Sequence, residues 1–434
     1  MRVAAKKNIT VPDNVQELLL QKIHEAEEEM GAKYAFQYLT LATETEKAEI
    51  IRWYASGKIE ADDIRKVYPD LYYFMQPTFG TMETAQTWCM AYMDQYKKAK
   101  LANTYSSEIE TVLLEKNMNE VTFNTWYNNF KTTRTLFNMR TDIQVYFWID
   151  GMGLEWIPFV AEIIRERKQD GFFLNEVYIA RATLPTVTDI NKIELQKLAG
   201  GPLDKFGDLD GDSHKVRPYP SFIIDDMAKV REVINRILDE NPGKKIAIVS
   251  DHGISYMPQL RSGLNLSGIK GHHGGRYATW NSGKVVSDEK YKILDDQNTI
   301  CALRHESLTS KIDNGSGCHG GCTPEEVLVP IFIISDFELR TNCSIIQKSL
   351  EVSASNPVMR FTICGLSNKD MPFMVYNGKH YKLHLEDIEM YVSDPIDLVD
   401  SVDSVEVWVD DIAHPFHFKA KLGTEENDLF DDLF

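Results

Sequence analysis

An aspartate and a histidine stand side by side just after an apolar run in the middle of the chain. The run covers residues 246–249 and is typical of a buried strand, and Asp251, His252 and Gly253 follow it after one serine. A strand end is a rigid place to fix a carboxylate and an imidazole, and the glycine lets the backbone turn away sharply. The pair could ligate a divalent cation or could form a polar turn, so the metal hypothesis depends on partners elsewhere.

Asp150, Asp210 and His214 supply further ligand types. Asp150 ends an apolar stretch over residues 144–149 and precedes a glycine, where a lone aspartate is usually part of a turn. Asp210 and His214 are four residues apart and can both reach one ion. The alternating aspartates around them also resemble a calcium loop, but the distal glutamate of that motif is absent.

A histidine among glycines occurs late in the chain. His319 lies in the sequence Gly-Cys-His-Gly-Gly-Cys, and its glycine neighbours leave room for its ring to approach an ion. Cys318 and Cys322 are separated by three residues instead of the two of a zinc knuckle. We therefore predict ordinary free thiols at both positions.

Thr188 has the setting of a helix start. Pro185 ends the preceding strand, and residues 191–198 read as a helix that stops at Gly200. Thr188 at or near the N-cap could serve as a capping residue, worth about 1 kcal/mol. It could also be an alkoxide nucleophile, because a helix amino end favours an incoming phosphate and a bound metal lowers the pKa of the hydroxyl.

A short cationic segment between the last two metal-ligand candidates could contact phosphate. Residues 270–277 combine glycines with histidines and an arginine, a composition that suits a loop closing over an anion. The predicted substrate contacts are Lys192, His272, His273 and Arg276. The alternative is the ordinary polarity of an exposed loop.

The elements that must position these residues alternate between strands and helices. Strands are expected at 144–150, 174–182, 244–250 and 326–334, with helices after Asp150 and over 221–239. This alternation predicts an α/β fold with a mainly parallel sheet and helices on both faces. Chemistry in such sheets gathers at the carboxyl ends of the strands, where Asp150, Asp251 and His252 fall.

The regions before and after this α/β segment have different residue patterns. We predict a helical domain over 1–140 with an aromatic-rich core, the α/β domain over 141–338, a small β-sandwich over 339–422 and an acidic tail over 423–434. The tail carries Asp-Leu-Phe twice and is either a docking peptide for a partner protein or a disordered solubilising end. The helical domain is a second candidate surface for protein partners.

Composition restricts the classes of function. No apolar run approaches the roughly 20 residues of a membrane span, and the start lacks the apolar core of a secretory signal. Six scattered cysteines argue against a disulfide scaffold and favour a cytoplasmic location. The net charge of −18 disfavours a broad nucleic-acid-binding surface, although a metal centre can supply local positive charge.

Five motifs in order resemble the alkaline phosphatase superfamily: a strand ending in Asp, Pro-Thr-x-Thr, Asp-x-x-x-His, Ser-Asp-His-Gly and a late His-Gly-Gly. The similarity is closest to its nucleotide pyrophosphatase/phosphodiesterase and PglZ branches. Leu-Pro-Thr-x-Thr-Asp-Ile-Asn-Lys and His-Gly-Gly-Cys-Thr-Pro-Glu-Glu resemble a PglZ domain in particular. The resemblance covers about residues 142–337.

The resemblance implies a two-metal site with a threonine nucleophile, Thr188. One zinc would be held by Asp210, His214 and His319, and the second by Asp150, Asp251 and His252. The two ions would clamp an in-line phosphoryl displacement, with a covalent intermediate on Thr188. Zinc suits the ligand set, and manganese is the alternative.

The function expected from this resemblance is a metal-dependent phosphodiesterase or nucleotide hydrolase. PglZ domains occur in bacterial phage-defence systems of the BREX kind, so a role in antiviral defence is implied as well. A phosphomonoesterase or phosphomutase on the same fold is an alternative, whereas a sulfatase is disfavoured because no Cys-x-Pro-x-Arg motif is present. A different class of alternative is a metal-stabilised scaffold subunit with little or no activity.

Overall fold

A computed structural model describes residues 10–82, 84–137, 140–281, 287–338, 343–366, 371–399, 401–409 and 412–421. The chain divides into two compact units, residues 1–338 and 339–434. Both Asp-Leu-Phe copies of the acidic tail lie outside the described residues. In the part of the chain that is described, no helix combines the length and the apolar character that a bilayer crossing requires.

A five-stranded sheet with the strand order β2-β9-β4-β1-β3 forms the centre of the first unit. Its strands are β1 (Val145–Asp150), β2 (Phe173–Arg181), β3 (Lys205–Asp208), β4 (Ile246–Val249) and β9 (Leu328–Ser335). β1 is parallel to β3 and β4, and β9 is antiparallel to both of its neighbours, β2 and β4. The sheet is therefore mixed, with β9 as its single reversed strand.

The reversal of β9 has a consequence for the site. Leu328, the first residue of β9, pairs with Arg181, the last residue of β2. The segment that enters β9, including His319, therefore approaches the edge at which the parallel strands end. A parallel β9 would have placed that segment at the opposite edge.

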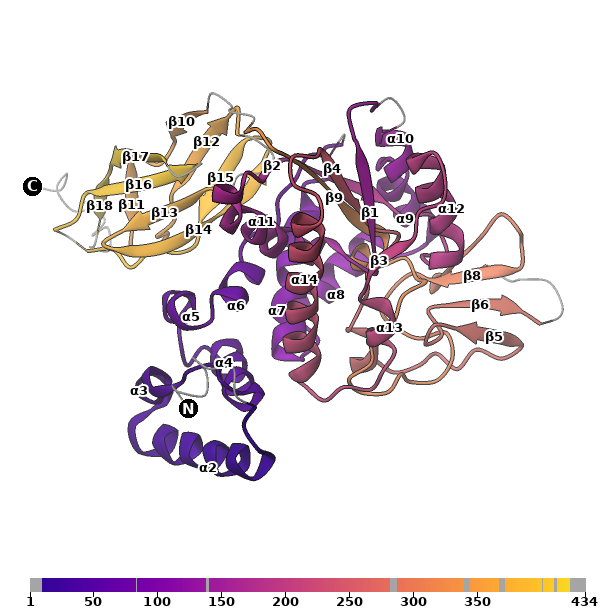
Figure 1. The fold of residues 1–434 in the computed structure, drawn as a ribbon, viewed down its shortest axis with the longest axis horizontal. Helices are drawn as coiled ribbons and strands as arrows, with labels where there is room; N and C mark the ends of the chain where they lie inside the picture. The colour runs from indigo at the N-terminus through magenta and orange to yellow at the C-terminus, as the bar shows by residue number, and fades with distance from the viewer. Residues whose placement is uncertain are drawn as a thin grey trace, which may run out of the picture. The chain divides into compact units, whose positions relative to one another are not determined.

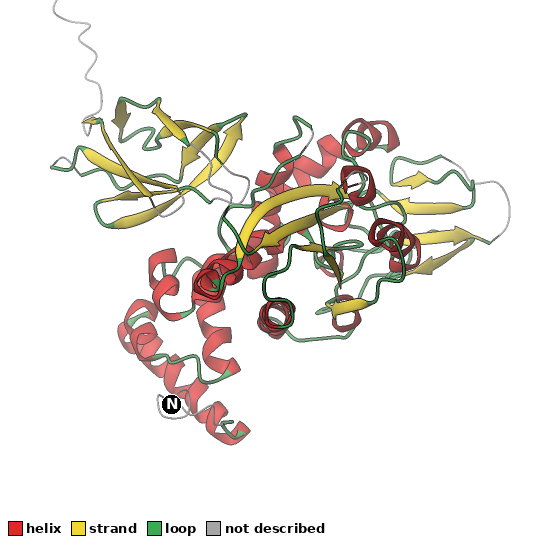
Figure 2. Cartoon of the chain, turned by 45° about the horizontal axis from the view of Figure 1, so that its top comes forward, coloured by secondary structure: helices red, strands yellow, loops and turns green. Residues whose placement is uncertain are grey.

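Helices cover both faces of this sheet. On one face α10 (Thr133–Phe137) and α12 (Thr188–Ala199) enclose an apolar cluster that includes Trp148 of β1, while α11 (Ile157–Glu166) and α14 (Ser221–Asp239) pack on the other face (Figures 1 and 2). Every residue of β4 and β9 is buried. This two-sided burial explains why both strands are continuous apolar runs without alternation.

The amino-terminal helices belong to the same compact unit as the sheet. They are α2 (Asp13–Met30), α3 (Ala32–Ala35), α4 (Glu44–Ala55), α5 (Ala61–Val67), α6 (Pro69–Phe74), α7 (Trp88–Ala102), α8 (Ser107–Lys116) and α9 (Glu120–Tyr127). Many of their aromatic residues form core, as predicted: Phe123 and Trp126 are buried with their rings edge to face, whereas Tyr34 of α3 is exposed. The Tyr127 hydroxyl donates to the Ala182 carbonyl at the end of β2, 2.9 Å away.

A four-stranded antiparallel sheet inserted between β4 and β9 did not emerge from the sequence. It comprises β5 (Ile269–His272), β6 (Tyr277–Trp280), β7 (Tyr291–Ile293) and β8 (Thr299–Ala302) in the order β5-β6-β8-β7. It stands at one end of the first unit, apart from the central sheet (Figures 1 and 2). The expected phosphate loop is the tight turn between β5 and β6.

The second unit is built from β strands. The seven-stranded antiparallel sheet contains β10 (Ser344–Gln347), β12 (Arg360–Cys364), β15 (Met390–Ser393), β14 (Lys379–Asp387), β13 (Phe373–Tyr376), β16 (Ser404–Val409) and β17 (Ile412–His417), in that order. β11 (Glu351–Ser353) and β18 (Lys419–Lys421) form a separate parallel pair. Where a two-layer sandwich was expected, one continuous, nearly closed sheet curls round a core that includes Phe361, Met374 and Val407.

Candidate metal centre

The six predicted ligands come from four segments that meet at one edge of the central sheet. Asp150 is the last residue of β1, and Asp251 and His252 follow β4. Asp210 opens the short helix α13 (Asp210–Ser213) directly after β3. His214 follows that helix, and His319 precedes α15 (Pro324–Val327), which leads into β9.

Three of these side chains form one group. Asp210 Oδ1 lies 3.0 Å from His319 Nε2 and 3.1 Å from His214 Nε2, and the two Nε2 atoms are 3.3 Å apart. Tetrahedral coordination with zinc–ligand bonds of about 2.0 Å places neighbouring ligand atoms about 3.3 Å apart. The three donor atoms are therefore spaced as such a cation requires.

The other three predicted ligands form a second group beside the first. His252 Nε2 is 3.4 Å from Asp150 Oδ1 and 3.5 Å from Asp251 Oδ2. The rings of His252 and His319 stack with their centroids 3.9 Å apart, so the two groups of ligands are in direct contact. The structure thus brings all six predicted residues together, and their role as ligands stays a prediction.

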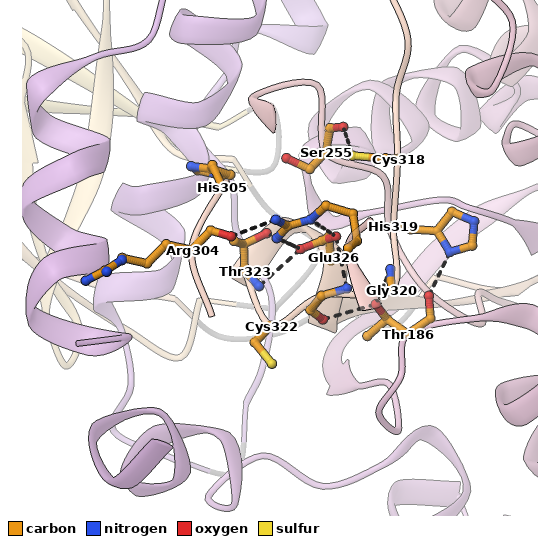
Figure 3. A network of polar contacts seen from close by, with 12 residues as sticks. Thr186, Ser255, Arg304, His305, Cys318, His319, Gly320, Cys322, Thr323 and Glu326 are labelled. Atoms are coloured by element: carbon orange, nitrogen blue, oxygen red, sulfur yellow. Dashed lines mark hydrogen bonds and ion pairs between the residues drawn. The ribbon is translucent and has the colours of Figure 1, made fainter. Parts of the chain in front are cut away.

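Backbone carbonyls orient two of the imidazoles. His319 Nδ1 is 2.8 Å from the Thr186 carbonyl (Figure 3), and His252 Nδ1 is 3.1 Å from the Gly253 carbonyl. A carbonyl can only accept, so Nδ1 carries a proton in each ring. Nε2 of His319 donates to Asp210 when it is protonated and offers a lone pair to a cation when it is not. Both Nε2 atoms face the carboxylates, which is the arrangement that second-shell partners give to metal-binding histidines.

The electrostatics of the second group favour a cation. Burial, together with the charge of Asp251, raises the pKa of Asp150 to about 6, although His252 and Lys205 oppose this. Burial also raises the pKa of Asp251, and its Oδ2 atom is buried without a hydrogen bond among the described residues. Asp150 and Asp251 both resist ionisation, and Asp251 Oδ2 has no donor among the described residues. A bound cation would stabilise both ionised carboxylates and would supply a partner for this oxygen.

The first group is already polarised by its own histidines. Burial opposes ionisation of Asp210, but hydrogen bonds from His214 and His319 outweigh it and hold the pKa of Asp210 well below its usual range. The hydrogen bond to Asp210 in turn raises the pKa of His214. Asp210 is therefore an ionised carboxylate throughout the neutral range.

Thr188 faces the second group of ligands. It is the first residue of α12, the N-cap position belongs to Val187, and no side chain caps this helix. The Thr188 hydroxyl lies 3.3 Å from both Asp150 Oδ1 and His252 Nε2. The capping role considered for Thr188 is therefore not used, and its hydroxyl points to the candidate metal ligands.

Asn191 holds the backbone that precedes Thr188. Its side-chain oxygen accepts from the Thr183 N–H at 2.7 Å, and its nitrogen donates to the carbonyls of Thr183 and Val187. Thr186 Oγ1 in the same loop accepts from the Gly320 N–H at 2.9 Å. The loops that carry the hydroxyl and the His319 imidazole are thus tied to each other.

Lys205 is a site residue that sequence reasoning missed. Its Nζ atom bridges Asp150 Oδ2, at 2.9 Å, and Asp208 Oδ2, at 2.7 Å. The signal available was a lysine three residues before an aspartate, in a four-residue strand too short to be recognised as such. The ammonium group neutralises part of the carboxylate charge at Asp150.

The four predicted substrate contacts lie in different surroundings. His273 lies at the site, with its ring centroid 4.2 Å from that of His319. His272 stacks on Tyr277, and Lys192 lies over the Trp148 ring. The predicted roles of His272 and Lys192 as substrate contacts stay predictions.

Arg276 requires a correction. It is fully buried, and its Nε and Nη2 atoms form a paired contact with Glu326 at 2.9 and 2.8 Å. Its Nη1 atom donates to the carbonyls of Arg304 and Glu306. The whole guanidinium is occupied by internal partners, so Arg276 is a structural residue and not a contact for phosphate.

The loops behind the metal ligands are packed without spare volume. A Cβ atom on Gly253 would lie 2.0 Å from the Glu325 carbonyl oxygen, so only glycine fits after His252. Glu325 accepts from the Tyr92 hydroxyl of α7 at 2.7 Å and from the Ser255 hydroxyl at 2.5 Å. Cys318 and Cys322 are buried free thiols, as predicted.

The raised pKa of Asp150 leads to a prediction for protein freed of metal by a chelator. Protonated Asp150 stabilises the fold at low pH, and this contribution is lost as the pH rises through about 6. We expect Asp150→Asn to flatten the fall in unfolding free energy between about pH 4 and about pH 6, measured by urea denaturation. Added zinc should remove the fall in the wild type, because the cation stabilises the ionised carboxylate.

Asp142→Asn is the control for this experiment. Hydrogen bonds from Arg140 and Lys245 hold the pKa of Asp142 well below its usual range, so its contribution is lost only as the pH falls below that window. Asp142→Asn should therefore leave the slope unchanged. If the unfolding free energies of wild type and Asp150→Asn changed equally with pH, the raised pKa of Asp150 would be contradicted.

Comparison with known proteins adds no family to these observations. No protein-family model matches the chain, and no curated protein matches it. The functional proposal therefore rests on the sequence motifs and on the geometry of the candidate metal centre.

Proposed function

We propose that this chain is a two-metal phosphoric ester hydrolase that uses Thr188 as its nucleophile and prefers phosphodiesters. The observation that carries the proposal is the Thr188 hydroxyl, 3.3 Å from both Asp150 Oδ1 and His252 Nε2. A hydroxyl beside a cluster of six metal-ligand side chains is the arrangement that activates an alcohol for attack on phosphorus.

The residues present suit two divalent cations. Asp210, His214 and His319 would hold one, and Asp150, Asp251 and His252 the other. Three imidazoles and three carboxylates favour zinc and leave manganese possible. When bound, the cations would lower the pKa of the attacking oxygen and balance the charge of the transferred phosphoryl group.

The chain's own groups account for substrate placement and proton transfer. Thr188 is at the amino end of the twelve-residue helix α12, where backbone N–H groups and the helix dipole favour an anion. The hydroxyl donates to Asp150 Oδ1, which is in place to take the proton as Thr188 Oγ1 attacks phosphorus. The bond to the leaving alcohol breaks as the new O–P bond forms, and water then cleaves the phosphothreonine ester to restore the hydroxyl.

The biological setting belongs to the proposal as well. The five ordered motifs support a PglZ-type domain of the alkaline phosphatase superfamily, and with it a role in bacterial anti-phage defence of the BREX kind. Protein partners would dock on the amino-terminal helices or the acidic tail. The scaffold alternative predicts metal binding without ester cleavage.

The full chain can be tested directly with bis-p-nitrophenyl phosphate after removal of metal and reloading with zinc or manganese. We expect turnover that depends on added metal and exceeds that of p-nitrophenyl phosphate. Faster cleavage of the monoester would assign a phosphomonoesterase instead. A chain that binds both ions yet cleaves neither ester with either metal would support the scaffold and contradict the hydrolase.

A further inference from the structure

A fourth imidazole, that of His273, reaches the candidate metal centre from the turn between β5 and β6. The ligand atoms of His214, His273 and His319 all lie within 4.8 Å of one another. The His273 ring centroid is 4.2 Å from that of His319 and 5.3 Å from that of His214. His273 Nδ1 is buried and makes no hydrogen bond with the described residues.

The β5–β6 turn holds His273 in an unusual backbone conformation. His273 has φ +46°, in the left-handed region that few residues other than glycine adopt. Gly274 and Gly275 follow with positive φ, and a Cβ atom on Gly275 would lie 2.3 Å from Ser307 Oγ. The turn therefore fixes the backbone from which the His273 side chain extends beside His319.

Arg276, the last residue of the same turn, is held by buried contacts. Its ion pair with Glu326 and its bonds to the Arg304 and Glu306 carbonyls fix the start of β6. Glu326 also accepts from the backbone of Gly321 in the loop that carries His319. One buried ion pair therefore fixes the positions of both His273 and His319.

We propose that His273 is a further protein ligand of the cation held by His214 and His319. The inserted sheet would then supply a direct bond to the metal, where the sequence suggested only a substrate contact. The donor atoms of His214, His273 and His319 lie within 4.8 Å of one another, and tetrahedral zinc requires roughly 3.3 Å, so metal binding would need a small adjustment of the His273 side chain. This inference rests on the metal-binding half of the proposed function and not on its chemistry.

A further ligand would make the two cations unequal. Asp210, His214, His273 and His319 would surround the first ion with four protein donors, the number found in closed zinc sites. The second ion, beside Thr188, would keep a position for substrate. We expect the first ion to bind more tightly and to be the last removed by a chelator.

Zinc retention by the full chain tests the proposal without reference to activity. His273→Asn removes the imidazole while keeping a residue type that adopts positive φ readily. We expect it to weaken the binding of one of the two zinc ions by at least about tenfold, as measured by competition with a chromophoric chelator. His272→Asn, one residue earlier in the same turn, should retain wild-type affinity for both ions.

A second experiment looks for a new absorption band when a thiolate replaces the His273 imidazole. With cobalt in place of zinc, His273→Cys should show thiolate-to-metal charge-transfer absorption that wild type and His272→Cys lack. Equal zinc affinity in wild type and His273→Asn, no new absorption in His273→Cys, or failure of wild type to bind either metal would overturn the proposal. A protein that loses zinc with His273→Asn but cleaves no ester would overturn only the hydrolase.

Discussion

Thr188→Ala is expected to lower diester turnover by roughly 10³- to 10⁶-fold, the range seen when a catalytic nucleophile is removed. The substitution deletes the hydroxyl that contacts Asp150 and His252. It leaves every predicted metal ligand in place. The loss should therefore appear in kcat, with zinc content unchanged by atomic absorption.

Two points control for effects of Thr188→Ala on folding: alanine should be tolerated in α12, and Thr188→Ser should keep the hydroxyl. Alanine is the best helix former, and the Thr188 side chain does not cap α12, so the fold should tolerate the change. Thr188→Ser retains the hydroxyl and should keep a measurable part of the activity. If Thr188→Ala kept turnover within about tenfold of wild type, water and not threonine would be the nucleophile.

Glu326→Gln is expected to destabilise the first unit by about 3–5 kcal/mol, the cost of leaving one partner of a buried ion pair without its counter-charge. Arg276 and Glu326 are both fully buried, and the paired contact is the only charge compensation that the described residues offer the guanidinium at hydrogen-bonding distance. Glutamine keeps the shape of Glu326, removes the charge and replaces one of the two acceptor oxygens with a donor. Urea denaturation followed by tryptophan fluorescence reports on this unit, because Trp408 is the only tryptophan beyond residue 338.

Glu194→Gln is the matched control. Glu194 pairs with Arg134 at 3.2 Å on the surface of the same unit, where an ion pair contributes about 0–1 kcal/mol. The two variants make the same chemical change and differ in burial. Similar stability of both variants would contradict a structural role for the buried pair, whereas loss of zinc affinity in Glu326→Gln alone would show that the pair also positions the metal ligands.

Part of the site was predictable because its residues follow strands. Asp150, Asp251 and His252 stand at the ends of apolar runs, and the parallel arrangement expected from alternating strands and helices brings such ends together. Asp210 and His214 were predicted from their four-residue spacing, whereas the short strand β3 that precedes them was not. The structure places all of these side chains at one edge.

Other features had no local signature. The apolar run of β9 is the same for a parallel and an antiparallel strand, since a strand buried on both faces shows no alternation. The inserted sheet has short strands in a glycine-rich segment that reads as a loop. Lys205 contacts Asp150, and His273 lies beside His214 and His319; these partners are far along the chain, so local patterns do not reveal the contacts.

The sequence by itself determined which side chains could bind a metal, and the strand ends determined where most of them lie. Only the tertiary structure decided that Arg276 is buried against Glu326 while the ring of His273, three residues earlier, lies beside that of His319. Both are polar residues of one short turn. Their surroundings differ because burial and charge pairing depend on segments some 30 to 60 residues away, which come together only when the chain folds.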